Sequence, residues 1–171
     1  MDTAFTGLRP RPPAPAVIDP LLEDHDWQLS YLTRVASELP IRLSPDFRAR
    51  LVTHHLGSEQ VIAGRSALFV WGARLPDVHE IYPRSGLRPK NVKVLNVHMH
   101  YRDFVRFEDR IVTEPYRSVM DVLQFHGLTY LTDIVDVRRH IDPDALAHRC
   151  RATRMSPHMW QEAIAVLKAA S

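Results

Sequence analysis

Four prolines that each follow a polar residue constrain the fold of this chain more than any other feature. They stand in the segments Ser44-Pro45, Thr113-Glu114-Pro115, Asp142-Pro143 and Ser156-Pro157. Proline suits the first position of a helix because no hydrogen bond from its nitrogen is needed there, and a preceding polar side chain can cap free backbone N–H groups. Each of these segments therefore predicts the start of a helix.

The first of these starts predicts a helix that begins at Pro45 and is closed by Gly57, with Phe47, Leu51 and His55 on one stripe. In the last third of the chain we expect helices near residues 115–126, 129–140, 143–152 and 157–169. The segment RSALFVWG (65–72) is too apolar to be exposed, and it predicts a short buried helix that ends at Gly72.

The middle of the chain changes to a pattern typical of strands. Residues 78–82, 92–100 and 110–113 are rich in β-branched and aromatic side chains, and prolines and a glycine separate the first two segments. In the second strand, alternation would place His98 and His100 on one face. The order of helices, a small sheet and more helices predicts an α+β fold with a mostly antiparallel sheet and a helical C-terminal third.

The N-terminal region differs in composition from the rest of the chain. Residues 1–18 include RPRPPAPA, which favours extended polyproline conformations, so we expect a disordered tail there. Residues 19–39 have the apolar spacing of an amphipathic helix, which Pro40 ends. We therefore predict a tail over 1–18 and a single α+β domain over 19–171.

Composition narrows the class of protein. The 171 residues have a formal net charge of +2, but residues 41–100 contain nine Lys or Arg against four Asp or Glu. This excess could attract an acidic partner or nucleic acid.

The single cysteine, Cys150, excludes a disulfide framework and a Cys-rich zinc site. Without an apolar stretch of about 20 residues or a signal-peptide pattern, we expect a cytoplasmic protein that does not contact membranes.

Three segments of this sequence resemble the C-terminal domain of AbiEi-type antitoxins, especially the actinobacterial forms. They are VIAGRSALFVWGARLP (61–76), KVLNVHMHYRDF (93–104) and RIVTEPYRSVMDVLQF (110–125). The last is similar to a family segment written Val-Thr-x-x-x-Arg-Thr-x-x-Asp, which here is Val112, Thr113, Arg117, Ser118 and Asp121. The resemblance covers about residues 51–131.

The resemblance implies a partner, because in that family the domain follows a DNA-binding winged helix-turn-helix and the partner is a nucleotidyltransferase-like toxin. The roughly 40 residues before Ile41 have room for one helix rather than three helices and a wing. We therefore expect neutralisation of a toxin by protein contact. The alternatives are a DNA-associated transcriptional regulator and a small metal-dependent enzyme.

The motif residues themselves have structural interpretations. Thr113 can cap the following helix, and Arg117 and Asp121 lie four residues apart on one helical face, where they can pair. Ser66, next to Arg65, is interpreted as a residue of a helix start because no base is assigned to it. We assign no catalytic residue and predict no cofactor.

Two further groups of residues are candidate sites. The loop PRSGLRPKNVK (83–93) gathers four basic residues between two predicted strands, and it is the candidate contact surface for an acidic protein or, more weakly, for DNA. These residues are Arg84, Arg88, Lys90 and Lys93. The pair His98 and His100 could supply two ligands to a metal if Asp103 or Glu108 joined them. Structural or surface histidines are the favoured interpretation, because the pair lies where the resemblance expects the end of a strand. It also lacks the upstream glycine and the suitably spaced third histidine of a His-x-His metal site.

Overall fold

The computed structural model describes residues 43–56, 60–83, 92–96, 98 and 100–170. The predicted tail over 1–18 and the predicted helix over 19–39 lie outside these residues. The described elements are α2 (Pro45–Leu56), β1 (Val61–Ile62), α3 (Gly64–Trp71), β2 (His79–Tyr82), β3 (Val92–Val94), β4 (Phe104–Phe107), β5 (Arg110–Thr113), α4 (Pro115–His126), α5 (Leu131–Asp136), α6 (Pro143–Ala152) and α7 (Pro157–Ala169), with short 3-10 turns at Tyr101–Asp103 and Arg138–His140.

The strands form one five-stranded sheet in the order β3-β2-β1-β5-β4. The predicted α+β class is confirmed. The sheet is mixed, however, because β1 with β2 and β4 with β5 pair antiparallel, whereas β2 with β3 and β1 with β5 pair parallel. The two-residue strand β1 lies at the centre, where Val61 is opposite both Tyr82 and Ile111. A segment this short has no periodicity, so the sequence could not reveal this central strand or the direction of its neighbours.

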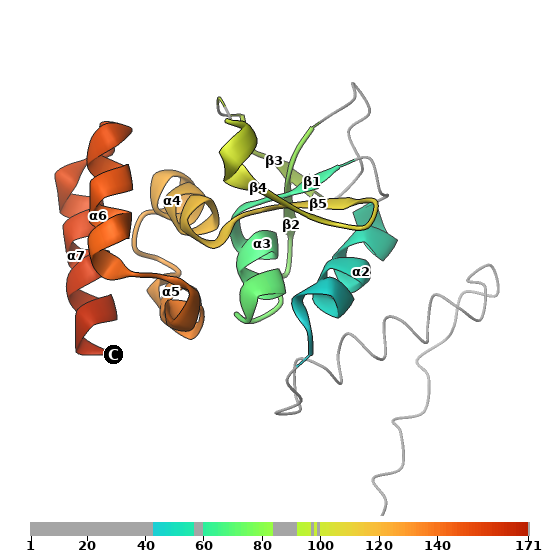
Figure 1. Cartoon of the computed structure of the whole chain (residues 1–171), viewed down its shortest axis with the longest axis horizontal. Coiled ribbons are helices and arrows are strands. Elements are labelled where there is room, and N and C mark those ends of the chain that lie inside the picture. The colour runs from blue at the N-terminus through green and yellow to red at the C-terminus, as the bar shows by residue number, and fades with distance from the viewer. Residues whose placement is uncertain (1–42, 57–59, 84–91, 97, 99, 171) are drawn as a thin grey trace, which may run out of the picture.

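Helix α3 lies at the centre of the packing. Seven of its eight residues are buried, and it packs against α4, α2 and β2. The indole Nε1 of Trp71 donates a hydrogen bond to the Thr113 carbonyl oxygen at 2.8 Å, which ties the end of α3 to β5. Figure 1 shows α2 and α3 on one side of the sheet, and α6 beside α7 at the end of the molecule away from α2.

Apolar side chains from all helices between α2 and α7 join one buried cluster. The sheet contributes Ile62, Ile81 and Val112 to it. Val61 and Tyr82, on the opposite side of their strands, belong to a smaller cluster with Ala63 and Leu95. Because successive residues of a strand point to opposite faces, both faces of the sheet carry buried apolar side chains.

The predicted helix starts agree well with the structure. The helices α2, α4, α6 and α7 begin at the four prolines, and β5 has its predicted bounds. The predicted helix over 129–140 is shorter, because Gly127 with φ +60° ends α4, a turn follows, and α5 gives way to a 3-10 turn after Val137. Among the described residues, every helix is too short or too polar to cross a bilayer.

The prediction of a long second strand over 92–100 is wrong. Strand β3 ends at Val94, and after Leu95 donates to the Ile81 carbonyl oxygen at 2.8 Å the chain leaves the sheet. It re-enters as β4, which forms a hairpin with β5 around Glu108 at φ +53°. This turn contains no glycine or asparagine, the residues that usually indicate a positive φ angle, so the sequence did not predict the hairpin.

Candidate functional site

A buried carboxylate from β2 lies at the start of α3. Glu80 is 2% exposed, and its Oε2 accepts a hydrogen bond from the backbone N–H of Arg65 at 2.8 Å. Its Oε1 lies 2.5 Å from His126 Nε2 on α4 and 3.6 Å from Lys93 Nζ on β3. The two side-chain nitrogens are 3.1 Å apart. This cluster therefore joins two strands and two helices around one negative charge, placed where the helix dipole favours it.

Gly64 makes this approach possible. It has φ +51°, and a Cβ atom built on it would lie 2.0 Å from Glu80 Oε2. A side chain at this position would therefore collide with the buried carboxylate, and its backbone angle would also be strained. The glycine of the AGRSA segment thus has a structural explanation in the packing of β2 against α3.

The motif residues Arg65 and Ser66 connect α3 to its neighbours. Arg65 Nε pairs with Asp133 Oδ2 of α5 at 3.0 Å, and its guanidinium lies 3.6 Å from the ring centroid of Tyr130. Ser66 Oγ accepts from the backbone N–H of Glu80 at 2.9 Å and lies 3.2 Å from His79 Nδ1. The placement of Ser66 in the first turn of a helix is confirmed, and its hydroxyl is engaged in holding β2.

The predicted pair of Arg117 and Asp121 is confirmed, and it belongs to a buried network. Arg117 Nε donates to Asp121 Oδ1 at 2.8 Å, and the Tyr82 hydroxyl donates to the same oxygen at 2.5 Å. Arg117 also donates to the Tyr82 oxygen at 3.0 Å and lies 3.7 Å from Asp103. Burial raises the pKa of Asp121 to about 6, although Arg117 and Tyr82 favour its charged form. Burial and the neighbouring Asp121 raise the pKa of Tyr82.

The prediction that Thr113 caps α4 is wrong. The capping residue is Glu114, whose carboxylate accepts from the backbone N–H groups of Arg117 at 2.9 Å and Tyr116 at 3.3 Å. Thr113 is the last residue of β5, and its hydroxyl lies 2.8 Å from the Ser118 hydroxyl. The longer glutamate reaches back over Pro115, and Arg149 of α6 pairs with the same carboxylate.

Of the four basic residues of the candidate loop, the structure describes one, Lys93. Arg84, Arg88 and Lys90 lie outside the described residues. Lys93 lies on β3, where its ammonium group pairs with Glu80 and sits 5.7 Å from the ring centroid of Phe125. Its positive charge is therefore used within the Glu80 cluster.

The histidines of the candidate metal site do not share a strand face, because β3 ends before both of them. The imidazole of His100 accepts from the Arg102 backbone N–H at 3.4 Å and lies 4.4 Å from the Tyr101 ring, measured between centroids. His98 is exposed and lines a hollow. Within the described part of the chain, no group of three or more His, Cys, Asp or Glu side chains is placed to hold a metal ion.

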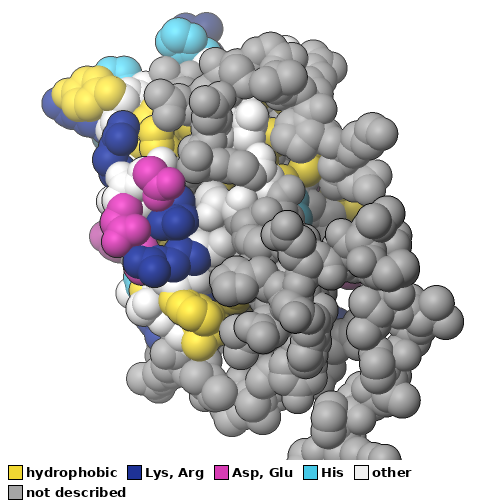
Figure 2. All heavy atoms as spheres, turned by 90° about the vertical axis from the view of Figure 1, so that its right-hand side faces the viewer, with side chains coloured by type: hydrophobic (Ala, Val, Ile, Leu, Met, Phe, Trp, Pro, Cys, Tyr) yellow, Lys and Arg dark blue, Asp and Glu magenta, His cyan; other side chains and the backbone are white. Residues whose placement is uncertain are grey.

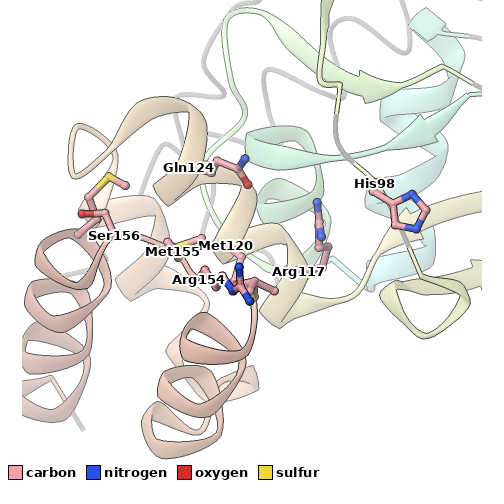
Figure 3. Close-up of a pocket in the computed structure, with 9 residues that line it drawn as sticks. His98, Arg117, Met120, Gln124, Arg154, Met155 and Ser156 are labelled. Atoms are coloured by element: carbon pink, nitrogen blue, oxygen red, sulfur yellow. The ribbon is translucent and has the colours of Figure 1, made fainter.

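That hollow, of about 480 Å³, lies between α4 and the connection from α6 to α7 (Figure 3). Three of its lining residues are methionines: Met120 on α4, Met155 in the connection and Met159 on α7. Arg117 reaches it from the buried network, and Arg154 lies beside Met155. Sequence reasoning missed this site, because the methionines come from separate segments and only the spacing of Met155 and Met159 was a possible signal. Unbranched thioether side chains adapt to differently shaped partners.

Other exposed regions differ in character from this hollow. On the face shown in Figure 2, basic and acidic side chains lie next to one another, and Arg50 pairs with both Asp46 and Glu108. Arg110 pairs with Glu108 and Asp109. The described charged side chains named here therefore pair with one another. Elsewhere, Tyr101 is 72% exposed, and its hydroxyl accepts from Arg102 Nε at 2.9 Å.

Comparisons with known proteins do not place the chain in a family. No family model matches it, and no curated protein sequence or solved structure is significantly similar to it. The resemblance to AbiEi-type antitoxins therefore stays a prediction from the sequence motifs, and we base the functional proposal on those motifs together with the contacts described above.

Proposed function

We propose that this chain is a protein-binding module of the antitoxin type, which neutralises a nucleotidyltransferase-like toxin by direct contact. The observation that carries the proposal is the methionine-lined hollow beside α4. Its volume of about 480 Å³ is that of a site for one or two large side chains rather than for water alone. Flexible thioethers are common on protein-binding surfaces.

The contacts of the motif residues within the fold also support a binding module. Arg65 bonds to Asp133, Ser66 bonds to the backbone of β2, and Arg117 bonds to Asp121. Arg65 and Ser66 bond to other elements of the fold, and Arg117 and Asp121 pair within α4, so each of these side chains has a partner inside the protein, as most buried polar groups do. The residues that carry the resemblance to antitoxins therefore maintain the scaffold, and contact with a partner is left to the surface around it.

The exposed Tyr101 provides a second point of support. Tyrosine and arginine are enriched among the residues that dominate binding energy at protein interfaces. Tyr101 and Arg102 are adjacent, exposed and in contact with each other. The turn that carries them reaches the hollow through the 3.7 Å contact between Asp103 and Arg117. One partner could therefore contact both the turn and the hollow.

A DNA-associated regulator is the second candidate. Its support is the excess of basic residues over 41–100 and the electrostatic effect of Arg139 on Arg48. Burial and the charge of Arg139 both lower the pKa of Arg48. Two neighbouring guanidinium groups attract phosphate, but Arg48 already donates to the carbonyl oxygens of Phe69 and Ala73 at 2.9 and 3.0 Å. Capping of the C-terminal end of α3 accounts for its position.

The test is co-expression with the protein encoded by the adjacent reading frame. We expect that protein to arrest growth when expressed alone, and we expect this chain to relieve the arrest and to copurify with it. A harmless neighbour, or toxicity that this chain does not change, would contradict the proposal. Duplex DNA binding measured over a salt series separates the second candidate, because phosphate contacts weaken steeply as salt rises.

A further inference from the structure

The charged side chains that line the hollow are basic. Among the described residues, its lining includes Arg117, Arg154 and His98 but no Asp or Glu. Arg117 is already engaged, because it pairs with Asp121 at 2.8 Å and with Asp103 at 3.7 Å. Arg154 is exposed, and the described residues include no ion-pair or hydrogen-bond partner for its guanidinium group. The hollow thus combines methionine side chains with a guanidinium group for which the described part of the chain offers no partner.

The backbone at Arg154 has a conformation that favours glycine. Its φ angle is +55°, and the N–H of the next residue, Met155, donates to the Cys150 carbonyl oxygen at 3.1 Å. This is the bonding pattern of a helix C-terminus whose left-handed position is most often glycine. An arginine here keeps a long cationic side chain beside the hollow at a conformational cost that glycine would avoid. The backbone angle also makes possible a variant that separates binding from stability.

The lining residues come from elements that the core holds in place. Met120 is 6% exposed and belongs to the main apolar cluster, so the floor of the hollow is fixed by packing. Figure 3 shows Met120 and Gln124 on α4 and Arg154, Met155 and Ser156 in the connection between α6 and α7. An apolar side chain that enters between these elements would contact thioethers, while a neighbouring carboxylate would be within the reach of Arg154.

We propose that the hollow binds a segment of the partner protein in which an apolar side chain stands next to an acidic one. The apolar side chain packs among Met120, Met155 and Met159, and the carboxylate pairs with Arg154. This inference rests on the proposed function as a protein-binding module, and it names the chemistry of the partner's contact. Complementary charge and an adaptable apolar floor favour this ligand over a basic or wholly polar one.

The experiment measures the dissociation constant between the full chain and the protein encoded by the adjacent reading frame. The variants are Arg154→Glu, Arg154→Gly and Met159→Ala. Arg106→Glu, at an exposed position on β4, is the matched control for charge reversal. We expect Arg154→Glu to weaken binding by roughly tenfold or more, because it places a like charge against the carboxylate. Arg154→Gly and Met159→Ala should weaken it several-fold, and Arg106→Glu should change it less than about twofold.

Thermal unfolding of the same variants separates a loss of binding from a loss of stability. Because glycine suits the backbone at residue 154, Arg154→Gly should melt at the same temperature as the parent chain or higher while it binds less well. A role of Arg154 in folding alone would instead lower the melting temperature and the affinity together, and would overturn the inference.

The outcomes distinguish the inference from the function on which it rests. If the parent chain forms no complex, the proposed function and this inference both fail. If the complex forms and the Arg154 and Met159 variants bind as tightly as the parent, only the inference fails. The Arg154→Glu variant could instead bind the partner protein as tightly as the parent chain and bind duplex DNA more weakly. That result would assign Arg154 to a nucleic-acid contact and would also overturn the inference.

Discussion

Replacement of Gly64 by alanine tests how the buried carboxylate is held at the start of α3. The new Cβ atom would lie 2.0 Å from Glu80 Oε2 and 3.1 Å from Leu95 Cδ1. Glu80 has little freedom to move away, because its two oxygens contact the Arg65 N–H at 2.8 Å and His126 Nε2 at 2.5 Å. The substitution must therefore displace a buried charge from its partners.

The expected cost has two parts. A residue other than glycine in the left-handed region costs about 1–2 kcal/mol. Displacement of a buried carboxylate from a hydrogen-bond donor costs about 1–3 kcal/mol more. Gly64→Ala should therefore lower the free energy of unfolding by about 2–5 kcal/mol, which is a large fraction of the roughly 5–15 kcal/mol typical of a folded domain.

A double-mutant cycle measured by urea denaturation separates the two parts. Gly64→Ala, Glu80→Ala and the double variant are compared with the parent chain. Once Glu80 is alanine, there is no carboxylate to displace, so the cycle should show a coupling free energy of about 1–3 kcal/mol. Gly127→Ala is a control for a positive φ angle without a steric clash, because Gly127 has φ +60° with ψ −135° and nothing lies within 4 Å of a Cβ atom at this position.

Additive free-energy changes would show that the alanine at position 64 does not displace the Glu80 carboxylate. If the free-energy changes of Gly64→Ala and Glu80→Ala sum to that of the double variant within about 0.5 kcal/mol, the alanine methyl does not act on the carboxylate. The requirement for glycine would then come from the backbone angle alone.

Two further predictions concern Asp121 and the helix caps. Burial raises the pKa of Asp121 from 3.8 to about 6, so its contribution to stability is complete below pH 3.8 and is lost as the pH rises through 6. Relative to the parent chain, Asp121→Asn should therefore gain up to about 3 kcal/mol of unfolding free energy between pH 3.5 and 7, as measured by urea denaturation, and a difference that does not vary with pH would contradict this. At the caps, Glu114→Ala should cost about 1–2 kcal/mol because it removes a side chain that accepts two backbone hydrogen bonds. Ser156→Ala should change the free energy of unfolding by less than about 0.5 kcal/mol, since Ser156 makes no capping bond. Chemical denaturation measures both variants, and a loss for Ser156→Ala as large as that for Glu114→Ala would contradict this prediction.

The sequence alone indicated the features that depend on neighbouring residues. Helices α4, α6 and α7 have the predicted bounds, and each begins at a proline, because the fixed φ angle of proline and its missing N–H suit the first turn of a helix wherever that helix lies. The pair of Arg117 and Asp121 was predictable for the same reason, since residues four apart on a helix are neighbours wherever the helix lies. The α+β class also followed, because it depends on the order of elements along the chain.

Contacts between residues far apart in the sequence depend on how the whole fold packs. The two-residue strand β1 exists because β2 and β5 hold it on both sides, and its length is too short for a periodic signal. Glu80, Lys93 and His126 come together from two strands and a helix, and the methionines of the hollow come from three segments. No local spacing encodes these contacts. They arise when the elements pack on one buried core, because packing fixes their mutual positions and so places both the buried charge and the open hollow.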